Sequence, residues 1–149
     1  MSPFFQRSGA TLAAVLGAAM CLPAHASSSD QLPPERQAGS ASFVSGGVGE
    51  GESQRFEAAF KHFPLIVQLF ENSGARDEYT ADALVKITDA KGRLVLQEKA
   101  DGPFMLVRLP AGDYRVAAAL KGHDLAEHTV HVTDSGHAKT TFVFPSSAG

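Results

Sequence analysis

The sequence has only one cysteine, Cys21, in 149 residues. It lies inside an apolar run near the start of the chain, so the rest of the chain carries no thiol. Disulfide bonds and cysteine-bound metal or redox centres are therefore excluded from that part. Its stability must come from a packed core.

The chain also has no block of basic residues, and no second long apolar run. Its charged residues are interspersed, and the net charge is −3. Nucleic acid and anionic membrane surfaces are disfavoured as partners, because both require basic clusters. A membrane-spanning helix needs about 20 apolar residues, and no segment provides them. We therefore expect no membrane span.

The first 26 residues are typical of a secretory signal peptide. Arg7 supplies a positive charge, apolar residues run from Ala10 to Leu22, and Ala24-His25-Ala26 is a small-x-small cleavage site. We expect cleavage after Ala26, which leaves about 120 residues, enough for one domain. Lipidation of Cys21 is an alternative, disfavoured because Met20 stands where a small residue is preferred.

Residues 27–42 and 43–63 are two different segments. The first holds little that could form a core and predicts a flexible linker. The second is a glycine-rich stretch followed by a helix, which Pro64 ends. One face of this helix carries apolar residues at i, i+3, i+4 and i+7, namely Phe56, Ala59, Phe60 and Phe63. We expect that face to pack onto the main body.

From residue 64 to residue 145 the apolar period changes to two. Seven short runs predict strands at 64–71, 83–88, 93–98, 103–109, 113–120, 125–132 and 137–144. Glycine-containing turns separate most of them, and no helical pattern intervenes. The sequence therefore predicts an all-β fold, either a sandwich or a barrel.

The run F-M-L-V-R-L-P-A-G-D-Y-R-V, residues 104–116, is the most strongly patterned part of the chain. Its first half is apolar on both faces, which indicates a strand covered on both sides. Pro110 and Gly112 predict a sharp turn. We expect Tyr114 to pack its ring and to bond nearby backbone through its hydroxyl, in a structural and not a catalytic role.

The motifs D-A-K-G at 89–92 and D-G-P-F-M-L-V-R-L-P-A-G-D-Y-R-V at 101–116 resemble those of carboxypeptidase regulatory-like domains. With S-G-G-V-G-E at 45–50, the chain is similar to a group of small exported proteins of Gram-negative proteobacteria. The resemblance implies a seven-stranded antiparallel, prealbumin-like (transthyretin-like) sandwich over residues 64–145, preceded by one short amphipathic helix. It also implies a periplasmic location, and it brings no catalytic residues. Its structural signature is Gly92, Leu109, Pro110, Gly112 and Tyr114.

The glycine segment is the first candidate site. A phosphate-binding loop is excluded, because Glu52 and Gln54 stand where a further glycine is needed and no Lys-Ser/Thr follows. The segment is then a flexible lead-in to the helix, or an interaction segment for peptide docking or self-association. Its residues are Gly46, Gly47, Val48 and Gly49.

Several histidines follow residue 122, and exported proteins do use histidine to bind copper or zinc. His128 and His131 are three residues apart on a predicted strand, so they face opposite sides and make a poor metal site. We expect solvated histidines without metal. The weak candidates for a metal site are His123, His131 and His137.

Catalytic chemistry finds little support. The 5-hydroxyisourate hydrolases of the transthyretin-like fold end in Tyr-Arg-Gly-Ser, whereas this chain ends in P-S-S-A-G. Ser45 and Ser53 are not in a G-x-S-x-G motif, and the acids Asp77 and Glu78 fall in a predicted polar loop. We expect no cofactor and a non-catalytic module that binds or packs against an unidentified cell-envelope protein. A histidine-based periplasmic metal-binding protein is the alternative, and a small hydrolase is third.

Overall fold

The chain folds into two β-sheets packed face to face, with one short helix. The computed structural model describes residues 31–75, 77–125 and 127–146, so the predicted signal peptide lies outside the described residues. The six-stranded sheet comprises β1 (Arg36–Ala38), β2 (Ala41–Gly46), β3 (Leu65–Asn72), β4 (Asp77–Tyr79), β7 (Phe104–Arg108) and β11 (Ala138–Phe144). The five-stranded sheet comprises β5 (Leu84–Asp89), β6 (Leu94–Lys99), β8 (Gly112–Leu120), β9 (His123–Asp124) and β10 (His128–Val132). The helix α1 (Glu50–Ala59) continues into one 3₁₀ turn, η1 (Phe60–His62).

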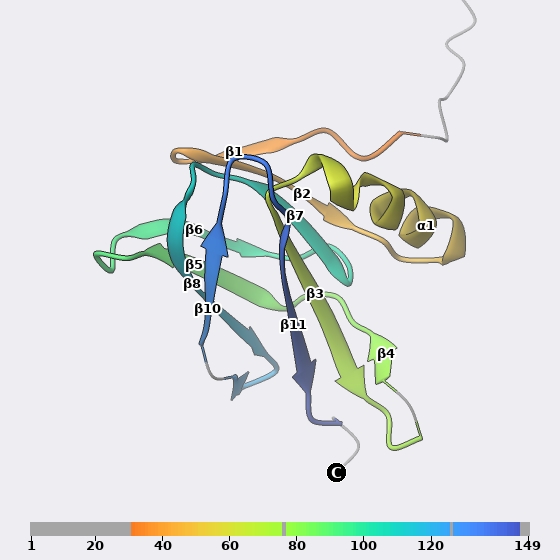
Figure 1. Cartoon of the computed structure of the whole chain (residues 1–149). Helices are drawn as coiled ribbons and strands as arrows, with labels where there is room; N and C mark the ends of the chain where they lie inside the picture. Colours follow the sequence, from red (N-terminus) through yellow and green to blue (C-terminus); the bar gives the residue numbers. More distant parts are fainter. Residues whose placement is uncertain (1–30, 76, 126, 147–149) are drawn as a thin grey trace, which may run out of the picture.

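Figure 1 shows how these strands are ordered in space. The first sheet runs β1-β2-β7-β3-β11, with β4 beside the far end of β3. The second runs β10-β8-β5-β6, with the short β9 beside β8. The predicted all-β fold is therefore confirmed.

The predicted number of strands is wrong. All seven predicted strands are present, as β3, β5, β6, β7, β8, β10 and β11, but the described part of the chain contains eleven strands. The missed strands β4 and β9 are too short to show a period, and β4 contains Asp77 and Glu78, which were predicted to lie in a loop. Strand β2 was missed because it is enclosed on both faces and four of its six residues are serine, glycine or alanine, so no alternation marks it.

The prediction of a flexible linker at residues 27–42 is wrong for the second half of that segment. Strands β1 and β2 form a hairpin within residues 36–46, and Ala41 lies in the core between the sheets. This polar stretch is ordered by ion pairs with distant residues: Arg36 with Asp101 at 2.6 Å, and Glu35 with Arg108 at 3.0 Å. Partners so far away in sequence leave no local pattern. The sandwich therefore begins near residue 36 and not at residue 64.

The resemblance implied a wholly antiparallel sandwich, and this prediction is wrong. Strand β11 pairs with β3 in parallel, from Ala138 opposite Leu65 to Phe144 opposite Glu71. The chain passes from one sheet to the other between β10 and β11, which lets β11 arrive in the direction of β3. Nor does the helix precede the sandwich, because α1 lies between β2 and β3 in the chain.

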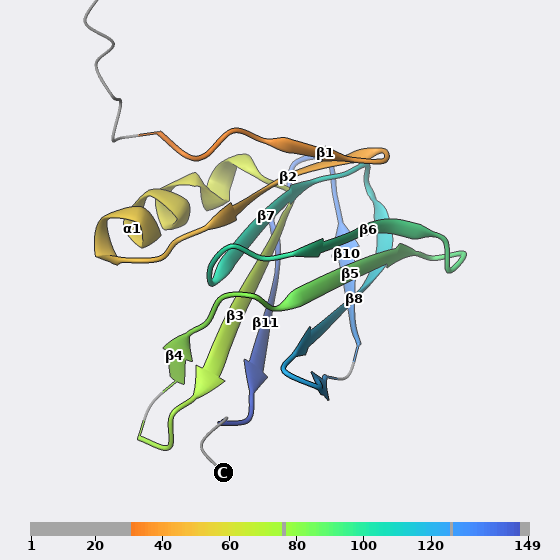
Figure 2. The ribbon, with the colours of Figure 1, turned by 180° about the vertical axis from the view of Figure 1, so that it is seen from behind.

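Strand β7 separates two apolar clusters. Met105 and Val107 point into the main core between the two sheets. Phe104 and Leu106 point the other way, into a second cluster under α1 that includes Phe56. Figure 2, like Figure 1, shows α1 and the five-stranded sheet on opposite sides of the six-stranded sheet. The predicted apolar helix face and the two-faced strand are therefore confirmed.

The corner between β7 and β8 is held by Tyr114. Its ring is buried in the core, and its hydroxyl donates a hydrogen bond to the carbonyl oxygen of Pro110 at 2.7 Å. Burial, followed by the nearby charge of Asp89, raises the pKa of this hydroxyl above 10.0, so it stays protonated as a donor. The structural role predicted for Tyr114 is confirmed.

The substitution Tyr114→Phe removes this hydrogen bond and leaves the ring in place. We expect it to lower the free energy of unfolding by about 1 kcal/mol. Chemical denaturation monitored by circular dichroism measures the change. Tyr114→Leu, which also loses ring packing, should destabilise more; equal losses in the two variants would contradict a role for the hydroxyl.

The turn between β5 and β6 depends on the carboxylate of Asp89. That carboxylate accepts hydrogen bonds from the backbone N–H groups of Lys91 and Arg93 and from Arg93 Nε, all at 2.9–3.0 Å. Gly92 closes the turn with φ +77°, a conformation that favours glycine. The backbone hydrogen bond from Arg93 is the main cause that holds the pKa of Asp89 below 3.8.

A lowered pKa makes the contribution of Asp89 depend on pH. The stabilisation is fully present above the unfolded-state pKa of 3.8 and is lost as the pH falls through the lower folded-state pKa. We expect Asp89→Asn to lower Tm at pH 7, with the gap to the wild type narrowing below pH 3.8. Thermal unfolding curves measure this difference in Tm. A difference that stays constant across this pH range would show that the ionised carboxylate does not cause it.

Candidate functional site

The predicted interaction segment forms the loop that leads from β2 into α1. Gly46 is the last residue of β2, opposite Phe104 of β7, and Gly49 caps the helix. Gly47 and Gly49 have φ values of +100° and +90°, which side-chain-bearing residues rarely adopt. The glycines are therefore required by the path of the backbone.

Close packing holds this loop in place. A Cβ atom on Gly47 would lie 2.4 Å from the ring of Phe104. A Cβ atom on Gly102, in the β6–β7 turn, would lie 2.4 Å from the backbone of Gly46. Two chain segments thus meet backbone to backbone, which only glycine permits. This arrangement differs from the flexible lead-in that the glycine content predicted.

Val48 is the exposed residue at the tip of this loop. Its side chain is 61% exposed, the largest exposed fraction among the large hydrophobic residues of the described chain. On the helix side the N–H of Ser53 donates to the carbonyl oxygen of Gly49 at 2.9 Å. The Ser53 hydroxyl donates to the carbonyl oxygen of Glu50 at the same distance. An aliphatic side chain is therefore presented to solvent on a loop that is fixed at both ends.

Beside this loop, Ser45 forms a polar cluster that the sequence did not reveal. Its hydroxyl donates to Asp101 Oδ2 at 2.9 Å and accepts from Asp101 N and from Arg36 Nη2, both at 3.1 Å. Because its proton and its lone pairs are all used, Ser45 ties β1 and β2 to the β6–β7 turn and is not an activated nucleophile. These residues are up to 65 positions apart, so no sequence motif joins them.

The histidines are dispersed, as the strand spacing predicted for two of them. His128 faces inward, stacked 4.2 Å from Phe142 with Nδ1 2.6 Å from Thr140 Oγ1. His131 is on the opposite face, with Nδ1 2.6 Å from Asp113 Oδ1. No group of three or more His, Cys, Asp or Glu side chains that could hold a metal is found among the described residues. The candidates His123, His131 and His137 are thus not assembled into such a group.

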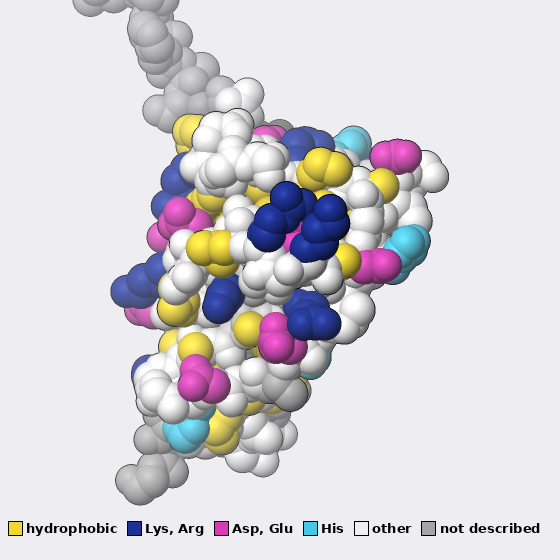
Figure 3. All heavy atoms as spheres, turned by 90° about the vertical axis from the view of Figure 1, so that its left-hand side faces the viewer, with side chains coloured by type: hydrophobic (Ala, Val, Ile, Leu, Met, Phe, Trp, Pro, Cys, Tyr) yellow, Lys and Arg dark blue, Asp and Glu magenta, His cyan; other side chains and the backbone are white. Residues whose placement is uncertain are grey.

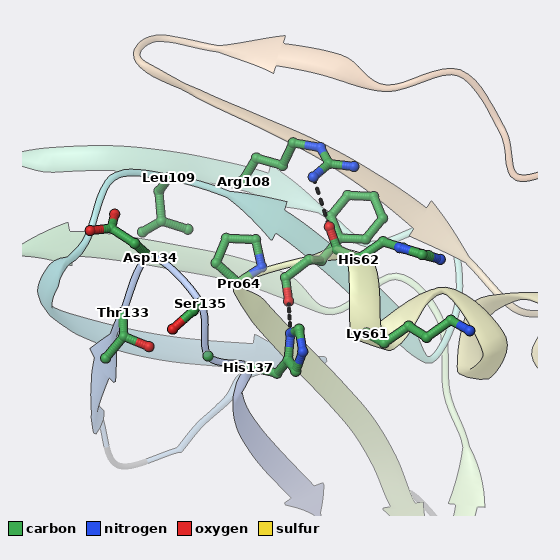
Figure 4. A pocket seen from close by; sticks show the side chains of 11 residues that line it. Lys61, His62, Pro64, Arg108, Leu109, Thr133, Asp134, Ser135 and His137 are labelled. Atoms are coloured by element: carbon green, nitrogen blue, oxygen red, sulfur yellow. Dashed lines mark hydrogen bonds between the residues drawn. The ribbon is translucent and has the colours of Figure 1, made fainter.

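A cleft of about 470 Å³ lies at one end of the sandwich (Figure 4). It lies between η1, the end of β7 and the loop that joins β10 to β11. Figure 4 shows Ser135 and His137 on one wall, with Pro64 and Leu109 facing them. Its lining residues are Lys61, His62, Phe63, Pro64, Arg108, Leu109, Thr133, Asp134, Ser135, Gly136 and His137.

Arg108 builds one wall of the cleft. Its guanidinium donates to the carbonyl oxygen of His62 at 2.7 Å and to Glu35 Oε1 at 3.0 Å, and lies 4.1 Å from the centre of the Phe63 ring. Burial opposes the charge on Glu35, but the hydrogen bonds from Arg108 and Ser42 outweigh it and keep the pKa of Glu35 below 4.5. Arg108 is therefore engaged in structure.

His137 makes a hydrogen bond to the backbone in this cleft. Its Nδ1 lies 3.0 Å from the carbonyl oxygen of Phe63, and a carbonyl can only accept. Nδ1 must therefore carry a proton, which leaves Nε2 as the hydrogen-bond acceptor of the neutral ring. The cleft can accept a hydrogen bond from a ligand there. The described part of the chain places no activated nucleophile beside it.

No protein-family model matches the chain, and no curated protein sequence is significantly similar to it. Within the described residues, no helix is long and apolar enough to cross a membrane.

A matched pair of alanine substitutions tests the packing of the glycine loop. Gly47→Ala and Gly49→Ala place a side chain at similar φ values, but a Cβ on Gly49 meets nothing within 4 Å. We expect Gly47→Ala to lower the free energy of unfolding by at least about 1 kcal/mol more than Gly49→Ala, because the buried Phe104 ring must move. Equal losses in urea denaturation would show that the loop does not pack on Phe104.

Proposed function

We propose that this chain is a non-catalytic, exported β-sandwich module that binds another protein of the bacterial cell envelope. Its contact site is the loop Gly46–Gly49. The observation that carries the proposal is the exposure of Val48 on a loop whose backbone is fixed by packing. A pre-ordered apolar side chain adds buried area to an interface without the cost of ordering a loop.

The domain type that we propose is the carboxypeptidase regulatory-like domain, with a prealbumin-like sandwich. The two motifs that suggested it occupy structural positions: D-A-K-G forms the β5–β6 turn, and L-P-A-G-D-Y forms the β7–β8 corner. The periplasmic location follows from the predicted signal peptide and from the same resemblance. Both remain parts of the proposal.

The absence of catalysis is supported by what the polar side chains do. Ser45 is held in the cluster with Arg36 and Asp101, and Arg108 is used to build a cleft wall. The metal-binding alternative has weaker support, because His131 and His137 contact different groups, Asp113 and the Phe63 carbonyl.

Photo-crosslinking in living Gram-negative cells tests the proposal. A crosslinking amino acid replaces Val48, and the products are identified by mass spectrometry. We expect one dominant adduct with a cell-envelope protein, because Val48 would be buried at the interface. Val48→Ser should weaken capture of that protein without changing Tm, since the side chain makes little contact within the chain.

The matched control carries the crosslinking residue at Ser135, which is also exposed but lies in the β10–β11 loop. This position should give no dominant adduct. The same set of products from both positions, or none from Val48, would contradict the assignment of the glycine loop as the contact site.

A further inference from the structure

The outer face of the five-stranded sheet carries a second candidate contact surface. Strands β5 and β8 alternate, so that every second side chain leaves the core and points outward. Figure 3 shows Lys and Arg side chains across the middle of this side of the molecule, with hydrophobic and acidic side chains among them. The outward residues near the centre are Leu84, Lys86, Arg115, Ala117 and Ala119.

Lys86 and Arg115 are neighbouring cations on this face. The register pairs Lys86 with Ala117 and Thr88 with Arg115, so the two cations stand on a diagonal of adjacent strands. Neither makes a hydrogen bond or an ion pair with any residue that the structure describes. The two nearby carboxylates are occupied, since Asp89 binds Arg93 at 2.9 Å and Asp113 lies 2.6 Å from His131.

A shallow apolar hollow adjoins these cations. Its volume is about 190 Å³, which is room enough for an aliphatic side chain. Leu84 on this face is 40% exposed. The hollow is lined by Leu84, Lys86, Gln97, Ala117, Ala118, Ala119, Asp124 and Leu125.

We infer that this face, which we call the Lys86–Arg115 face, binds an acidic polypeptide segment. An aliphatic side chain of the segment fills the hollow, and its carboxylates pair with Lys86 and Arg115. Asp124 lines the far end of the same hollow, opposite Ala119, which is four residues along β8 from Arg115, or about 13 Å away. The carboxylates of the segment therefore pair at the end of the hollow that holds Lys86 and Arg115, away from Asp124. The contact deepens the proposed role as a binding module, but it does not use Val48.

Charge and shape favour a polypeptide over a lipid surface. Two free cations are too few to hold an anionic membrane, where each contributes only about 1 kcal/mol. The hollow is small and is flanked by charged residues, which suits a segment that alternates acidic and aliphatic residues. In such a segment the aliphatic residue provides affinity, and the carboxylates provide orientation and speed of encounter.

Fluorescence anisotropy with three labelled peptides tests the inference on the full chain as cells produce it. The first peptide alternates glutamate and leucine, the second replaces glutamate by glutamine, and the third replaces leucine by serine. We expect the first to bind at least about tenfold more tightly than the other two, because each loses either the ion pairs or the buried leucine. Equal binding of all three, or no binding of the first, would overturn the inference.

Matched variants locate the site. Lys86→Gln and Arg115→Gln should each weaken binding of the glutamate–leucine peptide about two- to fivefold, as expected for exposed ion pairs. Ala117→Phe should fill the hollow and weaken binding about tenfold. Lys61→Gln removes the same charge from η1, in the cleft, and should have no effect. An equal effect of Lys61→Gln would show that the peptide responds only to the net charge of the protein, and would overturn the assignment of the site.

The remaining outcomes separate other occupants and the proposed function. Dimerisation at rising concentration that Arg115→Gln abolishes would assign this face to a second copy of the chain. Binding to anionic phospholipid vesicles that Lys86→Gln abolishes would assign it to a membrane; either result overturns the inference. Val48→Ser should leave peptide binding unchanged. Loss of peptide binding in that variant would show that the two surfaces are not distinct.

Discussion

The need of β7 to bury both faces determines the layers of this molecule. Five consecutive residues, four of them fully enclosed, cannot be accommodated at the surface of a two-layer sandwich. The second sheet covers Met105 and Val107, and α1 must cover Phe104 and Leu106. Because Phe104 fills the space beside the residue that follows β2, only glycine fits at position 47. The exposed tip of that loop is thus a consequence of the core.

The sequence predicted those elements whose evidence is local. Strands with alternating residues, the apolar face at Phe56, Phe60 and Phe63, and the bond from Tyr114 to nearby backbone all depend on neighbours a few positions apart. The hairpin at residues 36–46 could not be predicted in this way. Its ion-pair partners, Asp101 and Arg108, lie 65 and 73 positions further along the chain, and ion pairs with such distant partners have no periodic signature.

The candidate sites follow the same division. The glycine loop was identified as an interaction segment from composition, but its fixed backbone depends on contacts with Phe104 and Gly102. The separation of His128 from His131 was predictable, since two strand residues three apart face opposite sides. The two cations on the five-stranded sheet could not be predicted, because charged residues are interspersed along the sequence. Lys86 and Arg115 become neighbours only when β5 pairs with β8 and their side chains point to the same face of the sheet.

The parallel pairing of β11 with β3 also determines when the fold can form. Thr141 bonds Gln68, 73 residues earlier, and Phe142 and Phe144 complete the core between the sheets. Contacts at such sequence separation form slowly, because the intervening chain must first be confined. A nascent chain without its last strand lacks one edge of the larger sheet and two core phenylalanines. The core between the sheets can therefore close only after β11 has paired with β3.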